Sequence, residues 1–393
     1  MDCLPESWVP GFAEEHNAEA AAVWAAFRAG DPIRPPVFLG TNARFFLFNE
    51  ELNPKGRLSF EAYTIDPQAT LDFQLRAAAW RARYLAPCCD DPVGLPDKFT
   101  VKVDLQNFDE AAYFGAPVVF LDHQVPATLP ILQGDRKNAL FDAGLPDPLS
   151  GGWYRQAHRL CAGMRARIER EPTYLDRPIE MEPFGIYTCG PLTLAHQLRG
   201  TELLTDFYDD PGYVRQLLDF LVEGTIARIY AHRRFFGLEP ISPDLFMAED
   251  DVQLISATLL DEFVVPALKK LKAGLTSAER IKVHICGDGT RHFRTFRDEL
   301  GVYEFDTGFP VGFGRLRREL GPEVTIWGGP NVMILKDGTP AQVAEETTRI
   351  LESGICAGGR FVLREGNNLA PHTPRANLSA MYEAARTWKG RTD

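Results

Sequence analysis

A histidine and a cysteine lie two residues apart at the end of a β-branched segment. Residues 281–285 read Ile-Lys-Val-His-Ile, and Cys286 follows before Gly287 and Gly289. This run predicts a strand that leads through a glycine turn into an amphipathic helix over residues 291–300. Alternate side chains of a strand share a face, so His284 and Cys286 are expected to point the same way. Such a pair can chelate Zn²⁺; the alternative is a buried histidine beside a buried free cysteine.

Two side chains do not complete a zinc site, so other segments must supply further donors. Catalytic zinc usually keeps three protein ligands and one open position. Three sources remain open: Cys189, the acids at residues 249–251, and Asp306, all at the ends of predicted strands. Cys356 precedes its strand and is therefore expected at the opposite end of the fold.

The rest of the chain reads as strands alternating with helices. The main predicted helices cover residues 67–84, 154–168, 211–236, 257–271, 340–353 and 374–388, and the predicted strands include residues 37–40, 101–105, 118–121, 182–188, 245–248, 302–305, 324–327 and 361–363. This rhythm favours an α/β fold, a (β/α)₈ TIM barrel formed by one domain over residues 31–390, after an N-terminal helical extension over residues 1–30. A doubly wound sheet is the main alternative, but residues 40–44 lack its glycine-rich phosphate loop.

Composition excludes several classes of function. The 393 residues are 45% hydrophobic and 24% charged, as in a globular protein with a large core. No apolar run approaches the roughly 20 residues of a membrane span, and the first residues lack a secretory signal, so a cytoplasmic protein is expected. A net charge of −12 argues against a nucleic-acid partner. The seven scattered cysteines are expected to be thiols.

Polar side chains follow most of the predicted strands. In a (β/α)₈ barrel the catalytic residues lie where strands end. Each residue alone also suits a turn, so their convergence on one mouth of the barrel carries the prediction. Asp251 and Asp306 are predicted to be catalytic. The residues predicted to bind a cofactor or substrate are Asn42, Arg44, Gln106, Tyr187, Asn331 and Asn367.

A series of motifs in a fixed order resembles the uroporphyrinogen decarboxylase superfamily. The motifs are Arg-Pro-Pro-Val at 34–37, Gly-Pro-Leu-Thr-Leu at 190–194, His-Ile-Cys-Gly at 284–287, Gly-Gly-Pro-Asn-Val at 328–332, Asp-Gly-Thr-Pro-Ala-Gln-Val at 337–343 and Pro-His-Thr-Pro-Arg-Ala-Asn at 371–377. The resemblance covers residues 34–388 and implies a (β/α)₈ fold. The superfamily includes the haem-pathway decarboxylase and zinc- and corrinoid-dependent methyltransferases.

Departures from the family pattern help to decide between the two branches of the superfamily, the decarboxylase and the methyltransferases. The decarboxylase carries arginines that grip the acidic side chains of the porphyrinogen, and here that segment retains only Arg44. It also carries a histidine where this chain has Asn367. In the methyltransferases the resemblance implies a third zinc ligand, a cysteine, at the same position. The third ligand is therefore left open among Cys189, Asp251 and Asp306.

The sequence thus predicts a zinc-dependent methyltransferase that moves a methyl group to or from a corrinoid (cobalamin) carried by a partner protein. His284 and Cys286 would hold the metal, with Cys189 or a neighbouring acid completing the site. Arg44 would meet an anionic group. The alternatives are a uroporphyrinogen-type decarboxylase and a non-catalytic tetrapyrrole- or corrinoid-binding protein. A homodimer is the expected oligomeric state.

Overall fold

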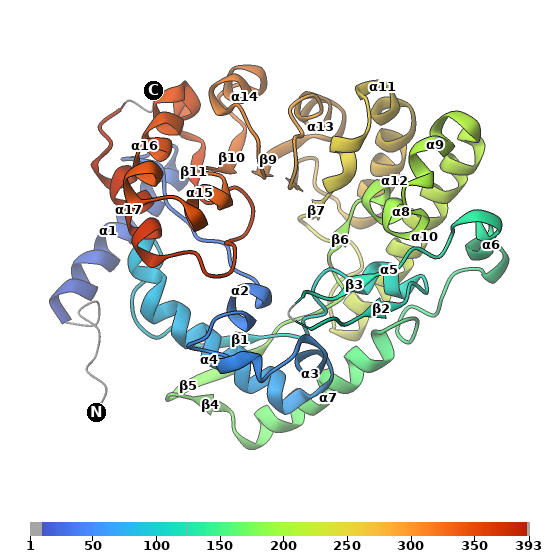
Figure 1. Cartoon of the computed structure of the whole chain (residues 1–393), viewed down its shortest axis with the longest axis horizontal. Coiled ribbons are helices and arrows are strands. Elements are labelled where there is room, and N and C mark those ends of the chain that lie inside the picture. The colour runs from blue at the N-terminus through green and yellow to red at the C-terminus, as the bar shows by residue number, and fades with distance from the viewer. Residues whose placement is uncertain (1–9, 123, 391–393) are drawn as a thin grey trace.

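The structure, a computed structural model, describes residues 10–122 and 124–390 and combines a parallel sheet with many surrounding helices (Figure 1). The strands are β1 (Phe99–Val101), β2 (Val118–Val119), β3 (Ala127–Thr128), β4 (Thr173–Tyr174), β5 (Arg177–Met181), β6 (Thr188–Cys189), β7 (Phe246–Ala248), β8 (Ile281–Ile285), β9 (Val302–Thr307), β10 (Thr325–Gly328) and β11 (Phe361–Leu363). The helices are α1 (Pro10–Ala29), α2 (Ala43–Leu47), α3 (Phe60–Ile65), α4 (Pro67–Tyr84), α5 (Asp109–Tyr113), α6 (Ala139–Ala143), α7 (Tyr154–Arg170), α8 (Pro191–Arg199), α9 (Glu202–Asp209), α10 (Pro211–Phe235), α11 (Ala257–Leu259), α12 (Val265–Leu275), α13 (Phe293–Leu300), α14 (Phe313–Leu320), α15 (Val332–Asp337), α16 (Pro340–Ile350) and α17 (Arg375–Thr387).

The central sheet has six strands in the order β11-β10-β9-β8-β7-β6, and every neighbouring pair is parallel. Ile281, Val283 and Ile285 of β8 are fully buried in the core, while Lys282 and His284 alternate with them on the other face. The period-2 burial follows from the pleat, and it sets which side chains can meet above the sheet. Helices α13, α14 and α16 lie outside the strands that they connect (Figure 1).

Local signals explain several helix boundaries. Helix α4 begins at Pro67 after Asp66, whose side chain accepts hydrogen bonds from the amides of the first turn. Thr339 and Gln342 form a capping box at the start of α16. The sequence predicts a helix over residues 257–271 that is interrupted or kinked at Pro266, and the structure shows an interruption just before it: α11 and α12 are joined by a π-helical segment over Leu260–Val264. The missing amide of proline explains an interruption there.

The sheet does not close into a ring through hydrogen bonds among the described residues. Next to β11, residues 37–40 contribute a single bridge, Val37 to Leu363, and β1 pairs with β5 in a separate sheet. Buried carboxylates occupy the two edges: Asp90 accepts the amide of Val37 at 2.7 Å, and Glu110 accepts the amide of Cys189 at 2.8 Å. The described residues therefore show a parallel α/β arrangement with an open seam, and the closed (β/α)₈ barrel that the sequence predicted is not formed by strand pairing among them.

Two predicted strands differ from the structure. Residues 118–121 form β2, which pairs antiparallel with β3 outside the central sheet. Residues 182–188 contribute only the start of β6, and the preceding segment forms the β4–β5 hairpin, which the sequence did not predict. The turn residues Leu175 and Asp176 both have positive φ, a conformation that leucine rarely adopts. The sequence therefore lacks the glycine or asparagine pair that usually indicates a hairpin turn.

The described part of the predicted N-terminal extension is α1; residues 1–9 lie outside the described residues. Trp24 of α1 donates to the carbonyl of Asp90 at 2.9 Å, and Glu19 pairs with Arg34 at 3.0 Å. The helix is therefore held against the Asp90 backbone directly and, through Arg34, against the Asp90 carboxylate at one edge of the sheet. None of the described helices combines the length and apolar character that crossing a bilayer requires.

Candidate functional site

Three side chains with different donor atoms converge beyond the carboxyl ends of β7 and β8. Their ligand atoms, an Asp250 carboxylate oxygen, a His284 nitrogen and the Cys286 sulfur, all lie within 4.8 Å of one another. Asp250 begins the 3₁₀ segment after β7, and its Oδ1 accepts the Cys286 amide at 2.9 Å and lies 3.7 Å from His284 Nε2. Oxygen, nitrogen and sulfur donors in one group of three match the donor set of a catalytic zinc.

A second pair of residues fixes the orientation of the His284 ring. Its Nδ1 donates to Asp306 Oδ2 at 2.9 Å, and Arg364 Nη1 donates to Asp306 Oδ1, also at 2.9 Å. Asp306 is the register neighbour of His284 on β9. Burial disfavours the imidazolium, but the hydrogen bonds to Asp306 and Cys286 and the charges of Asp306 and Asp250 outweigh it and raise the pKa of His284 to about 10. With Nδ1 engaged, Nε2 is the nitrogen that would bind a metal, and binding would displace the proton that it carries in the imidazolium.

Cys189 lies elsewhere than the sequence suggested. It shares a row of the sheet with His284, but Ala248 of β7 stands between them. Its thiol donates to Glu110 Oε2 at 2.6 Å, and burial together with the Glu110 charge raises the pKa of Cys189 well above its usual value. A metal ligand must be a thiolate, so the environment of Cys189 disfavours the ligand form. Among the described residues, the third group near the pair is Asp250.

The acids on either side of Asp250 have other partners. Glu249 is fully buried and accepts from the amide and hydroxyl of Thr193, at 2.8 and 2.6 Å. Asp251 Oδ2 bonds His196 Nδ1 at 2.9 Å, and this bond, opposed by burial, raises the pKa of His196. Asp251 and Asp306, the two predicted catalytic acids, therefore both hold a histidine, and only Asp306 touches the Asp250–His284–Cys286 group.

Three of the predicted binding residues, Asn42, Arg44 and Gln106, line a cavity of about 560 Å³. Gln106 has a positive φ of 55°, and its backbone N–H donates to Asp104 Oδ1 at 3.0 Å. The Gln106 Nε2 atom is buried without a hydrogen-bond partner. The rest of the lining mixes polar, charged and aromatic side chains, among them Tyr63, Phe73, Gln74, Arg81, Lys102, Asp104 and Glu182. A donor without a partner in a left-handed backbone marks a position suited to a ligand.

The other three predicted binding residues do not line this cavity. Asn331 caps α15, with Oδ1 accepting from Met333 N at 2.8 Å. Asn367 has φ 91° and its carbonyl accepts from Arg364 at 2.8 Å. The Tyr187 side chain is 60% exposed. The cavity lining also lacks the Asp250–His284–Cys286 group. The structure thus divides the predicted site into a metal-type group and a separate cavity, both following carboxyl ends of strands.

Buried partners that the sequence analysis did not single out connect these elements. Arg364 links Asp306 to the carboxylate of Glu365, which in turn accepts the Gly40 amide at 2.9 Å. Arg228 is fully buried and forms a close ion pair with Glu110. Arg364 could have been found by its place directly after the last strand. Arg228 lies in the middle of α10, where nothing in the local pattern distinguishes it from a solvated arginine.

Comparison with known proteins gives three findings. The family model described as uroporphyrinogen decarboxylase (URO-D) matches residues 182–388. Curated relatives include methylcobamide:CoM methyltransferase MtbA from Methanosarcina acetivorans, 26% identical over 201 residues, and MtbA from Methanosarcina mazei, 24% identical over 201 residues. Each alignment covers 51% of this chain and 57% of the relative.

A solved structure of a methyltransferase from Methanosarcina mazei aligns with a TM-score of 0.62 at 16% identity. It covers 93% of this chain and 98% of the other, so the likeness in fold extends over nearly the whole molecule. With the family model matching residues 182–388, more than half of the 393 residues, the chain belongs to the uroporphyrinogen decarboxylase family.

Proposed function

We propose that the protein is a zinc-dependent methyltransferase that transfers a methyl group between a corrinoid on a partner protein and a small acceptor or donor. The observation that carries the proposal is the Asp250–His284–Cys286 group, with three donors within 4.8 Å of one another. The activity of the relatives, methylcobamide:CoM methyl transfer, supports the class of reaction. The chain aligns with 57% of their length, so substrate and partner are part of the proposal.

The donor set fits zinc, and Asp250, His284 and Cys286 would hold it. A bound zinc ion would supply Lewis-acid character that makes a thiol or similar group a better nucleophile at neutral pH. Asp306 fixes the His284 tautomer with Nε2 available, and Arg364 holds Asp306 in place. The Cys286 amide donates to Asp250, which fixes the carboxylate against the same strand end.

The cavity of about 560 Å³ is proposed as the place where the substrate's polar part binds. Within the described part of the chain, neither Arg44 nor Lys102 has an acidic partner, and both line this cavity. Unpaired cations beside a donor left free on Gln106 suit an anionic group such as a carboxylate or sulfonate. The sequence analysis predicted that Arg44 binds an anionic group, and we propose that Lys102 and Gln106 bind the same group.

Metal analysis of the purified protein tests the proposal. We expect about one zinc per chain, and loss of that zinc in His284→Ala, Cys286→Ser and Asp250→Asn. Cys189→Ala is the matched control, because it removes a second thiol near the strand ends and should leave zinc unchanged. If Asp250→Asn retained zinc and Cys189→Ala lost it, the third ligand would be Cys189 and not Asp250.

Activity is tested separately with methylcobalamin as methyl donor and coenzyme M as acceptor, followed by the change in the corrinoid absorption spectrum. We expect turnover that depends on the three ligand residues. A protein free of zinc that releases CO₂ from uroporphyrinogen III would instead establish the decarboxylase. Tight corrinoid binding with no turnover of either kind would leave a non-catalytic binding protein.

The proposal extends to the fold and to the bounds of the domain. The open sheet is proposed to be a (β/α)₈ barrel, in which β1 takes the position between residues 37–40 and β6. Residues 31–390 are proposed as its single domain, preceded by the extension. The homodimer stays a prediction, tested by light scattering of the purified protein.

A further inference from the structure

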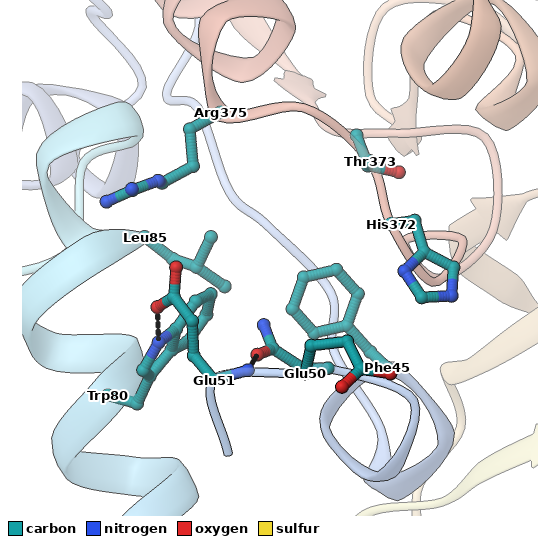
Figure 2. Close-up of a pocket in the computed structure, with 9 residues that line it drawn as sticks. Phe45, Glu50, Glu51, Trp80, Leu85, His372, Thr373 and Arg375 are labelled. Atoms are coloured by element: carbon teal, nitrogen blue, oxygen red, sulfur yellow. Dashed lines mark hydrogen bonds between the residues drawn. The ribbon is translucent and has the colours of Figure 1, made fainter. Parts of the chain in front are cut away.

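A second cavity, of about 300 Å³, lies where the segment after α2, helix α4 and the approach to α17 meet (Figure 2). The charged side chains of its lining, Glu50, Glu51 and Arg375, are exposed. In Figure 2 the Glu51 carboxylate is hydrogen-bonded to Trp80 Nε1, at 2.7 Å. Exposed charged side chains are the normal case on a protein surface, so this cavity carries no ligand assignment. A group better placed to bind a ligand lies beside the metal-type group.

This group is the side-chain amide of Gln253, which lies next to Asp250, His284 and Cys286. Gln253 belongs to the 3₁₀ segment over Asp250–Leu254 that follows β7. A 3₁₀ helix has three residues per turn, so side chains three positions apart lie on the same face. Gln253 is three positions after Asp250 and therefore shares the face on which Asp250 joins the metal-type group.

Contact with Gly287 places the amide independently of this periodicity. A Cβ built on Gly287 would lie 2.0 Å from Gln253 Oε1 and 2.5 Å from Gln253 Nε2. The amide therefore packs directly against the Cα of Gly287, the residue that follows Cys286. Consecutive Cα atoms are about 3.8 Å apart, so a molecule only a few atoms long, held at the metal-type group, reaches this amide. Glycine at position 287 leaves the space that the amide occupies.

The backbone of Gln253 is held in place, whereas its side-chain amide has no hydrogen-bond partner. Arg291 donates to the carbonyl of Gln253 and, through Nε, to the carbonyl of Ile255 at 3.0 Å. His292 Nε2 lies 3.2 Å from the same Ile255 carbonyl. Among the described residues, neither the oxygen nor the nitrogen of the Gln253 amide forms a hydrogen bond. A side chain that is anchored at its base, with its donors and its acceptor free, is suited to bind a ligand.

We propose that Gln253 binds the molecule held at the metal-type group, through a hydrogen bond between its amide and a polar atom close to the molecule's reacting sulfur. The inference rests on the proposed function, because it takes a small thiol as the ligand. Gln253 does not line the cavity of about 560 Å³ that is proposed for the substrate's anionic group. The amide therefore recognises the near end of the ligand, and the cavity recognises its far end. The favoured class is a short thiol with a hydrogen-bonding group a few atoms from the sulfur.

Isothermal titration of the zinc-loaded full-length protein tests this with 2-mercaptoethanol and with 1-propanethiol, in which a methyl group replaces the hydroxyl. Gln253→Met keeps the length of the side chain and removes its hydrogen bonds. The affinity ratio of the two thiols should fall about two- to tenfold in this variant, as expected for one lost hydrogen bond, with zinc content unchanged. Gly287→Ala should lower the ratio likewise, because the added Cβ displaces the end of a flexible side chain. Leu254→Ala, at a side chain that is 45% exposed in the same segment, is the matched control and should keep the wild-type ratio.

The outcomes separate this inference from the proposed function. A wild-type ratio in zinc-loaded Gln253→Met would overturn the inference alone, and the amide would then only cover Gly287. An equal fall in Leu254→Ala would also overturn it, because the ratio would then depend on the segment and not on the amide. Zinc-loaded wild-type protein that binds neither thiol would overturn it as well. Wild-type protein that carries no zinc would overturn the proposed function, and the inference with it.

Discussion

Replacing Arg228 by methionine tests how the buried edge of the sheet is held. Arg228 is fully buried, and its guanidinium pairs with Glu110 and donates to the Tyr154 hydroxyl at 2.8 Å and the carbonyls of Gly185 and Tyr187 at 3.0 and 2.9 Å. Methionine fills a similar volume without charge or donors. Glu110 is then left as a buried carboxylate that accepts only from neutral donors, the thiol and amide of Cys189 and the hydroxyl of Thr188.

The expected cost follows from removing one member of a buried ion pair. Such a change typically costs about 3–5 kcal/mol, because an uncompensated charge remains in a medium of low polarity. A typical folded domain is stable by about 5–15 kcal/mol, so this cost is a large fraction of the total. Burial already raises the pKa of Glu110 against the opposing charge of Arg228. Without Arg228 the pKa should rise further.

The sign of the pH dependence follows from that direction. A carboxyl whose pKa in the folded state exceeds its value in the unfolded chain binds more protons when folded, so it favours folding at low pH and loses this contribution as the pH rises. Arg228→Met should therefore be less destabilised at pH 5 than at pH 7.5. The double variant Glu110→Gln/Arg228→Met removes the charge and should recover part of the loss at pH 7.5.

Urea denaturation followed by circular dichroism at both pH values measures these differences, with the wild-type protein in parallel. Tyr208→Phe, a change at a side chain that is 72% exposed, serves as the neutral control. The reasoning is refuted if Arg228→Met costs less than about 1 kcal/mol at pH 7.5, the upper range of a surface pair. It is also refuted if the double variant is no more stable than the single one.

Three further predictions concern the metal-type group and the histidines. Asp306→Asn should retain zinc at saturation but weaken its affinity about 10–100-fold in a chelator competition, because the partner that orients His284 is lost; unchanged affinity would contradict this. Gly40→Ala should weaken zinc and cost about 1–3 kcal/mol in urea denaturation, because an added Cβ would lie 2.1 Å from Arg364 Nη2 and displace Arg364 from Asp306; an unaltered protein would oppose this arrangement. Burial lowers the pKa of His232 to about 4 in the folded protein. Below pH 6.5 this histidine is therefore protonated in the unfolded chain but stays neutral in the folded protein until about pH 4. The contribution of His232 to the free energy of unfolding should then fall by ~2 kcal/mol between pH 7 and 5. His232→Asn should therefore shift the difference in unfolding free energy between these two pH values by about that amount relative to the wild type; an unchanged difference would contradict the assignment.

The elements that the sequence predicted well are those with a local signal. Helix α4 spans Pro67–Tyr84 as its helical spacing and proline start indicated, and β8 spans Ile281–Ile285 as its β-branched run indicated. The β4–β5 hairpin was missed because its turn uses Leu175 and Asp176 in place of a glycine pair. The alternation of strands and helices predicted a closed ring of strands. That alternation cannot show which backbone amides will donate to a buried carboxylate and not to a neighbouring strand, as those of Val37 and Cys189 do.

The sequence by itself determined that His284 and Cys286 share a face, because a two-residue spacing on a strand has only one outcome. It also determined the family, through motifs whose order survives along the chain. Only the tertiary structure decided that Asp250 stands beside them while Cys189 bonds to Glu110, a residue 79 positions away in the chain. The physical reason is that a thiol and a carboxylate acquire their roles from their neighbours in space. Those neighbours are brought together by packing between elements that no local pattern encodes.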